Sequence, residues 1–369
     1  MERYRKCVFC ETQFLHEILS RLSDKTFSFE SLSEYELWIN VRSLLLSSDI
    51  KLYLNISKSE FDNNIKDIEK RRLNAAKKGK DYQLSHFEKL IWDISLKQRN
   101  NEIHLKLLDK YPNLDEFENI SDKELDAFYF TCKKRDECRK LMEEYGILVV
   151  SPENIMEFLF VLFDQGVAIH KQEQGNWNNI LKEVVLPCNS MIIVDNYVLN
   201  ELEQAKENLK GIFEALLPQS LNNCIPFQII IFSALRHNKN IDLPSKVRLE
   251  EITKLLESIR PNLKFELTIV KCSSDKFHDR TIITNNYYIG CGGGFDLFKS
   301  RRSQKTTTVN IVTPYLNHSI KWATKAYSNL VSESSSVYRE SPEFMGDSFP
   351  NFHIGVNKNR LLESMVVRR

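Results

Sequence analysis

The sequence predicts an α/β protein with two domains, and three observations lead to that prediction. Short apolar stretches typical of buried strands alternate along the chain with longer stretches of helical period. The chain has 369 residues, more than a single hydrophobic core usually serves. A polar stretch, 164–174, interrupts the alternation near the middle. We therefore predict a parallel α/β domain at 1–163, a linker at 164–174, a second α/β domain at 175–331 and a mostly irregular tail at 332–369.

Composition and charge limit the classes of function. Apolar residues make up 42% of the chain and charged residues 27%, with a net charge of +1, so any binding of nucleic acid must use local patches. The apolar run 155–163 is too short to cross a bilayer, and the first residues contain no apolar signal region, so we expect a cytoplasmic protein without a transmembrane segment. Buried thiols are favoured over a zinc site formed by Cys7, Cys10, Cys132 and Cys138, because the second spacing is unusual.

Strands and helices alternate in the first half of the chain. We expect strands at 6–9, 50–56, 125–131 and 147–150. We expect helices at 14–22, 33–47, 58–80, 84–108 and 134–145, the last of them capped by Gly146. Since each strand is followed by helix, the expected sheet is parallel and Rossmann-like.

The second half repeats this alternation without being a copy of the first. Strands are expected at 191–194, 227–232, 265–270, 280–284 and 308–312. Helices are expected at 177–185, 199–217, 245–259 and 320–331.

One segment of the second half indicates phosphodiester chemistry. His278 and Arg280 stand at the start of an apolar strand, Asn285 lies five residues after the arginine, and a glycine-rich turn follows at 290–294. Histidine supplies a nucleophile, arginine neutralises phosphate oxygens, asparagine orients a ring, and glycine lets the backbone approach a ligand.

This order of residues resembles the HxKx4D motif of the phospholipase D superfamily, with Arg280 in place of lysine and Asn285 in place of aspartate. It is more similar to the phospholipase-D-like domain at the C-terminus of MIT-domain proteins, over about 175–331. The matching residues are His278-Asp279-Arg280-Thr281-Ile282, Asn285, Gly292-Gly293-Gly294 and Asp296-Leu297-Phe298. The resemblance implies His278 as nucleophile, Arg280 as phosphate clamp and Asn285 as orienting group, without a cofactor. Because the chain has one copy of the motif, catalysis would require a homodimer that brings two histidines together.

Further pocket residues are expected from the positions of strand ends. Ligands of open α/β sheets gather where strands end, and Asp195, Ser233 and Arg236 follow predicted strands. Gly292, Gly293 and Asp296 belong to the glycine turn and complete the expected phosphate pocket. Each of these residues could instead serve as a turn residue or a helix cap.

The start of the chain resembles PIN-domain ribonucleases, which place an acidic residue and a threonine or serine after their first strand. Here Glu11, Thr12 and Gln13 follow the first predicted strand. The resemblance implies a Mg²⁺ or Mn²⁺ site. Its expected ligands are Glu11, Glu60, Asp62 and Asp126, with Asp122 as an alternative to the last.

Two clusters of cations could hold a nucleic-acid backbone, or could be solvated surface. They are Lys70-Arg71-Arg72 on a predicted helix and Arg301-Arg302 after the glycine turn. The chain is rich in lysine, asparagine and isoleucine, which is typical of AT-rich bacterial genomes. We therefore expect a phosphodiester-directed nucleic-acid-binding protein or nuclease, in the setting of prokaryotic anti-phage defence. The alternative is a non-catalytic scaffold that binds a phosphorylated ligand or a lipid headgroup.

Overall fold

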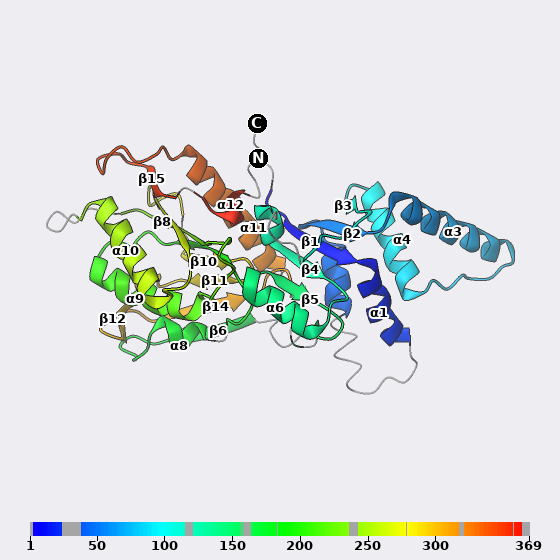
Figure 1. The fold of residues 1–369 in the computed structure, drawn as a ribbon, viewed down its shortest axis with the longest axis horizontal. Coiled ribbons are helices and arrows are strands. Elements are labelled where there is room, and N and C mark those ends of the chain that lie inside the picture. The colour runs from blue at the N-terminus through cyan, green and yellow to red at the C-terminus, as the bar shows by residue number, and fades with distance from the viewer. Residues whose placement is uncertain are drawn as a thin grey trace.

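The computed structural model describes residues 3–23, 38–114, 121–155, 157, 164–182, 184–235, 243–277, 279–316, 321–356 and 358–363. Its architecture is mixed α/β, with one parallel sheet, sheet A, and one larger mixed sheet, sheet B (Figure 1). The predicted α/β class is therefore confirmed. Among the described residues no helix combines the length and apolar character that a bilayer span requires.

Sheet A is formed by the first half of the chain. Its strands, all parallel, are β1 (Lys6–Glu11), β2 (Ile50–Asn55), β3 (His104–Leu107), β4 (Ala127–Phe130) and β5 (Leu148–Val150). Its helices are α1 (Thr12–Ser23), α3 (Lys58–Lys77), α4 (His86–Arg99), α5 (Asp122–Leu125) and α6 (Arg135–Tyr145), and residues 38–45 are also helical.

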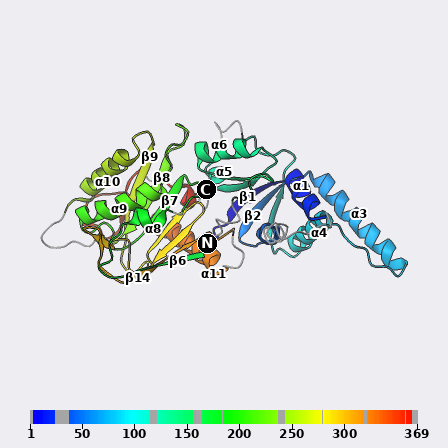
Figure 2. The same cartoon turned by 90° about the horizontal axis from the view of Figure 1, so that it is seen from below.

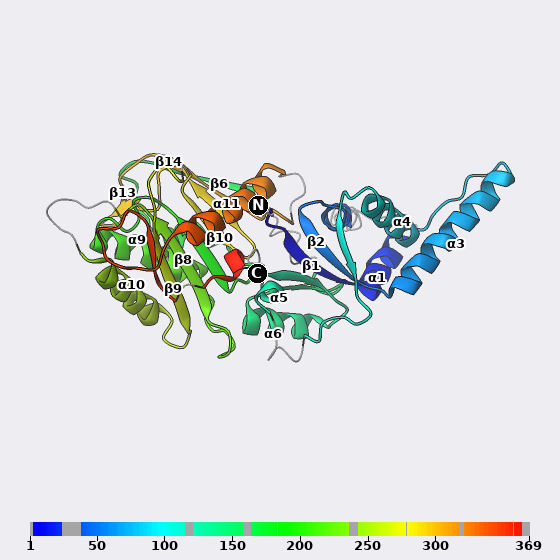
Figure 3. The same ribbon diagram turned by 90° about the horizontal axis from the view of Figure 1, so that it is seen from above.

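The strands of sheet A follow the order β3-β2-β1-β4-β5, so the chain reverses its direction of winding at β1. Helices cover both faces as a result: α4 lies on one face and α6 on the other (Figures 2 and 3). Because both faces are covered, the central strands are apolar throughout, as in β4 with its sequence AFYF. The predicted parallel sheet is confirmed.

Sheet B has a parallel centre and antiparallel flanks, in the order β15-β9-β8-β7-β10-β11-β14-β6. Its strands are β6 (Asp164–Ile169), β7 (Ser190–Val194), β8 (Phe227–Ser233), β9 (Phe265–Lys271), β10 (Thr281–Thr284), β11 (Tyr288–Cys291), β14 (Thr307–Val312) and β15 (Phe352–Gly355). Strands β7, β8 and β9 are parallel to one another. A two-stranded hairpin, β12 (Phe298–Lys299) and β13 (Arg302–Ser303), stands beside it.

The helices around sheet B lie on both of its faces. They are α8 (Trp177–Leu181), α9 (Leu202–Leu216), α10 (Ser245–Ile259), α11 (Lys321–Glu340) and α12 (Arg360–Glu363). Figure 2 shows α8, α9 and α10 on one side of the sheet and α11 on the other. Helices α9 and α10 share a face because they are successive crossovers between parallel strands, which have the same hand.

Three predictions about local structure were wrong. The expected linker 164–174 contains β6, an edge strand that pairs with β14, because an edge strand needs only one apolar face. The expected irregular tail 332–369 contains the end of α11, the strand β15 and the helix α12. The expected helix 84–108 ends at Arg99, and β3 follows it.

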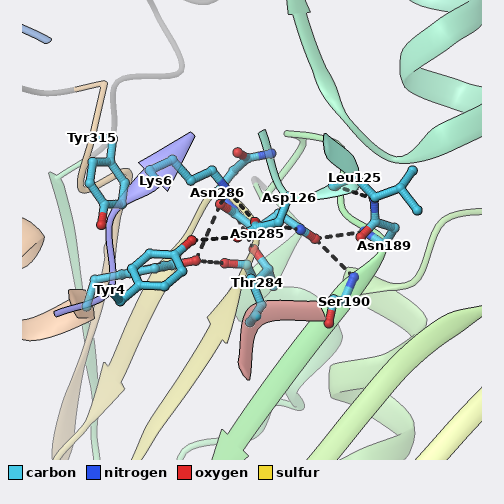
Figure 4. A network of polar contacts seen from close by, with 12 residues as sticks. Tyr4, Lys6, Leu125, Asp126, Asn189, Ser190, Thr284, Asn285, Asn286 and Tyr315 are labelled. Atoms are coloured by element: carbon cyan, nitrogen blue, oxygen red, sulfur yellow. Dashed lines mark hydrogen bonds and ion pairs between the residues drawn. The ribbon is translucent and has the colours of Figure 1, made fainter. Parts of the chain in front are cut away.

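The two sheets meet through the amino ends of their parallel strands (Figure 4). Lys6 begins β1 and donates from Nζ to the backbone oxygen of Asn285 at 2.7 Å. Asn189 precedes β7 and donates from Nδ2 to the backbone oxygens of Leu125 and Tyr145, both at 2.9 Å. The buried apolar side chains of both sheets form one contiguous core. The carboxyl ends of the strands therefore point away from the shared interface.

A buried ion pair lies at the centre of this interface. Lys6 is 1% exposed and Asp126 3%, and their side chains form an ion pair. The other carboxylate oxygen of Asp126 accepts from the Tyr4 hydroxyl at 2.6 Å. Burial lowers the pKa of the Lys6 ammonium, and the charge of Asp126 opposes that change. A buried pair of this kind is stable only when hydrogen bonds satisfy its remaining donors and acceptors.

Candidate functional site

The carboxyl ends of β7 and β8, the start of β10 and the end of β11 form one edge of sheet B, the carboxyl edge. Register places these ends together, because Thr281 of antiparallel β10 pairs with Val194 of β7 and with Gly290 of β11. Asp195 follows β7, and Arg280 precedes β10. The structure thus brings together Asp195, Arg280 and the glycine turn Gly292–Gly294.

The glycine turn packs against carboxylates on its inner side. Gly294 has φ +90°, and a Cβ atom added there would lie 2.8 Å from Oδ1 of Asp296 and 3.1 Å from Oδ2 of Asp195. Both the backbone conformation and the space favour glycine at this position. The nitrogen of Gly293 donates to the Thr307 hydroxyl at 2.8 Å, which fixes the turn to β14.

The buried side chain of Asp195 stabilises the glycine turn. It is 1% exposed, and its carboxylate accepts from the backbone nitrogens of Phe295 at 2.5 Å and Tyr197 at 2.8 Å. Burial raises the pKa of Asp195, and these two hydrogen bonds oppose the rise. The Asp195 carboxylate therefore makes its hydrogen bonds to backbone nitrogens, and its role is to position the glycine turn.

Two cations flank the glycine turn. Arg280 donates from one guanidinium nitrogen to the backbone oxygen of Gly292 at 3.0 Å, and its guanidinium lies 5.7 Å from the ring centroid of Tyr197. Lys305 donates to the backbone oxygen of Gly293 at 2.8 Å. A guanidinium has five N–H donors, so in the described part of the structure Arg280 keeps donors for a ligand.

The other cation is partly neutralised. Nζ of Lys305 lies 3.4 Å from Oδ1 of Asp296, a half-buried carboxylate. Both side chains are partly exposed to solvent, so the ion pair is weak, and Lys305 could exchange Asp296 for a phosphate group.

Ser233 and Asn196 organise the loops around the edge. The Ser233 hydroxyl, which is fully buried, donates to the backbone oxygen of Asn196 at 3.3 Å. The Asn196 side chain donates to the backbone oxygens of Ser274 and Phe277, at 3.0 and 3.1 Å. Asn196 was not predicted. Its position directly after Asp195 at a strand end was the available signal.

Two predicted site residues, His278 and Arg236, lie outside the described residues. Asn285 lies within them, but not at this edge. It follows β10, whereas Arg280 precedes it, so about 16 Å of extended strand separates the two. The predicted grouping of Asn285 with Arg280 was therefore wrong, because a strand between them carries them to opposite edges of the sheet.

Asn285 instead joins the two sheets through buried side-chain hydrogen bonds (Figure 4). Its Oδ1 accepts from the backbone nitrogens of Asn189 and Ser190, at 2.9 and 3.0 Å. Its Nδ2 donates to Oδ1 of Asp126 at 3.0 Å.

The four carboxylates predicted to hold Mg²⁺ or Mn²⁺ do not converge. Asp126 precedes β4 and is bonded at the interface, whereas Glu11 ends β1 at the opposite edge of sheet A and accepts from the backbone nitrogen of Cys132 at 2.6 Å. Glu60 lies in the first turn of α3 and Asp62 follows it by two residues; both are exposed, and this spacing turns them to different sides of the helix. In the described part of the chain, no group of three or more histidine, cysteine or acidic side chains is arranged to hold a metal.

A cavity of about 640 Å³ does open near the carboxyl ends of β1 and β2. Helices α1, α3 and α4 line it. Its lining includes Thr12, Gln13, His16, Glu60, Arg71, His86, Phe87 and Glu88. The imidazole of His16 stacks on Phe87, with ring centroids 3.8 Å apart. Of the four predicted metal ligands, only Glu60 lines this cavity, and Glu11, Asp62 and Asp126 do not.

The cation cluster of α3 is largely engaged with its own surroundings. Arg71 forms ion pairs with Glu88 at 2.6 Å and Asp67 at 3.4 Å, and Arg72 lies 4.9 Å over the Trp92 ring. Lys70 is exposed. This cluster thus supplies less free positive charge than its sequence indicates.

The fold and these contacts define a mixed α/β protein with a cationic turn at the carboxyl edge of its larger sheet. Comparison of the chain with protein-family models and with curated proteins finds no match.

Proposed function

We propose that the protein binds phosphodiester groups of nucleic acid at the carboxyl edge of sheet B, with Arg280 as the principal phosphate ligand. One observation carries the proposal: Arg280 and Lys305 flank the same glycine turn, each donating to one of its carbonyl oxygens. The guanidinium fork matches the geometry of phosphate oxygens, and Arg280 has more donors than its one hydrogen bond to Gly292 uses.

Binding is proposed in preference to cleavage, because of the position of Asn285. A histidine that attacks phosphorus needs a group that orients its ring, and Asn285 is bonded at the opposite edge of the sheet. The carboxylate nearest to Arg280, Asp195, is bonded to backbone nitrogens.

Fluorescence anisotropy with a labelled single-stranded oligonucleotide tests the proposal. A charge-assisted hydrogen bond contributes about 1.5–3 kcal/mol, so Arg280→Ala is expected to weaken binding about tenfold or more. Arg139→Ala is the matched control, since Arg139 is an exposed arginine on α6, and it should bind like the unaltered protein. Equal affinity of the Arg280→Ala variant and the unaltered protein would contradict the proposal.

Two other outcomes would replace it. Binding to vesicles that carry a phosphoinositide, without binding to oligonucleotides, would assign the edge to a lipid headgroup. Cleavage of the oligonucleotide that persists in EDTA and is lost in His278→Ala would show that the edge also cuts, because phospholipase-D-type chemistry requires no metal.

A further inference from the structure

We propose that the β12–β13 hairpin extends the carboxyl edge of sheet B, so that the ligand is a polynucleotide strand contacted at several phosphates. This inference rests on the proposed function and names its substrate class. A mononucleotide or a single phosphorylated headgroup would engage Arg280 alone, whereas a strand would continue over Arg301 and Arg302 of the hairpin.

The hairpin has a strained turn that projects an arginine. Ser300 and Arg301, at its tip, have φ of 52° and 59°, in the left-handed region. Residues other than glycine pay roughly 1–2 kcal/mol each for this conformation. Strain of this kind persists only where the surrounding structure determines it, and it is common at sites of function.

Glu207 of α9 stabilises the strained turn. Its carboxylate accepts from the backbone nitrogens of Ser300 at 2.9 Å and Arg301 at 2.6 Å. Arg301 and Arg302 are both exposed, and neither side chain forms an ion pair within the described residues.

The loop that follows β6 holds the other side of the hairpin. The nitrogen of Gln172 donates to the oxygen of Ser303 at 2.8 Å, and the nitrogen of Ser303 donates to the oxygen of Glu173 at 2.9 Å. The nitrogen of Gly175 donates to the oxygen of Arg301 at 3.1 Å. The hairpin is therefore bonded on both sides, and its arginines are presented from a fixed backbone.

The hairpin and the glycine turn are parts of one packed unit. Trp177 is fully buried and packs its ring on Phe295 and Phe298, with centroid distances of 5.1 and 5.6 Å. Its indole nitrogen and the backbone nitrogen of Phe298 both donate to Oδ1 of Asn208, at 3.0 and 2.9 Å. This packing links the glycine turn, to which Arg280 donates, to the hairpin.

The spacing of the cations suits a strand. Lys305 donates to the glycine turn, and Arg302 precedes it by three residues, so their Cα atoms are at most about 11 Å apart. A nucleic-acid strand advances about 3.4 Å per nucleotide in a duplex, so that span covers at most about three phosphates. Lys299 contributes less to the field, because it lies 3.7 Å from Glu201.

The test compares a dinucleotide with a single strand of about ten nucleotides, within the site sizes of single-strand-binding folds. Affinities are measured by anisotropy over a range of salt concentrations for Arg301→Ala/Arg302→Ala, Arg280→Ala and the Arg139→Ala control. The hairpin variant is expected to weaken binding of the long strand and to lower its salt slope by about two, one for each phosphate contact. Its affinity for the dinucleotide should stay unchanged, whereas Arg280→Ala should weaken both.

The outcomes separate this inference from the proposed function. If the hairpin variant binds the long strand with unaltered affinity and slope while Arg280→Ala weakens it, the inference is overturned and the proposed function stands. If neither variant affects either ligand, both fail. Equal loss for the dinucleotide and the long strand in the hairpin variant would also overturn the inference. Circular dichroism of each variant confirms that it remains folded.

Discussion

Gly294 shows how one residue limits what the candidate site can tolerate. A side chain there would meet the carboxylates of Asp296 and Asp195, and the backbone is in a conformation that L-residues avoid. The glycine turn therefore requires a residue without a Cβ atom at position 294. The same turn supplies the carbonyl oxygens to which Arg280 and Lys305 donate.

We predict that Gly294→Ala lowers the free energy of unfolding by about 2 kcal/mol, from backbone strain and steric conflict. Gly292→Ala is the matched control, because its added Cβ would lie 3.6 Å from the Thr307 hydroxyl, an ordinary contact. The control should change stability by less than about 0.5 kcal/mol. Urea denaturation measures both, and a Gly294→Ala variant as stable as the control would refute this account.

The residues of the site were predictable where a strand end fixes their place. Asp195 and Arg280 could be grouped because Asp195 follows β7 and Arg280 precedes β10. These two strands are antiparallel, so the end of one and the start of the other lie at the same edge of the sheet. Asn285 could not be placed from spacing alone, since five residues of extended chain cross the sheet. Asp126 failed for a related reason: it lies at the start of its strand, whereas Glu11 lies at the end of a parallel neighbour, so the two are at opposite edges of sheet A.

At the scale of elements, the β12–β13 hairpin depends on a single carboxylate from α9. The backbone nitrogens of the strained residues Ser300 and Arg301 donate to Glu207. Three residues after which trypsin cleaves lie in or beside this turn: Lys299, Arg301 and Arg302. Removal of the carboxylate would leave the strain without compensation.

We predict that Glu207→Ala makes the hairpin an early site of trypsin cleavage, because local opening of the turn costs less once its acceptor is gone. Mass spectrometry of short digests should show new ends at 299, 301 or 302 before any other. Glu203→Ala on the same helix is the control, since Glu203 is an exposed partner of Lys206. Identical digestion of the two variants would contradict the proposed clamp.

An amphipathic helix and an apolar edge strand, β5, were predicted from the sequence, whereas two less apolar edge strands were not. The helix expected at 245–259 matches α10, because its period and length leave little ambiguity. The strands β3 and β6 were missed, since each has one neighbour in its sheet and a largely polar or glycine-containing sequence. Only the pairing partner, which lies far away in the chain, makes such segments into strands.

At the scale of the whole molecule, a buried polar network joins sheets A and B at the amino ends of their parallel strands. Lys6, Asp126 and Asn285 are all nearly or fully buried, and each depends on the others for its hydrogen bonds. The ion pair between Lys6 and Asp126 was not predictable, because the sequence does not show which polar residues of the two sheets will come into contact.

We predict that Lys6→Met lowers the free energy of unfolding by about 3–5 kcal/mol, because it leaves the Asp126 carboxylate buried without its cation. A double-mutant cycle with Asp126→Leu measures the coupling in urea denaturation. The double variant should cost clearly less than the sum of the single variants, since removing both charges leaves no unpaired ion. Additive costs would show that the pair is not coupled.

The meeting of the two sheets at their amino ends also determines how the cationic turn and the cavity are placed relative to each other. Each carboxyl edge lies one strand length from the interface, about 17–20 Å for strands of five or six residues. The cationic turn of sheet B and the cavity beside α1, α3 and α4 therefore face opposite directions. A polymer held at one end reaches the other only by a loop around the molecule, so the length of free polymer sets the effective concentration of the second contact. A ligand too short to pass around the molecule would therefore be confined to the cationic turn.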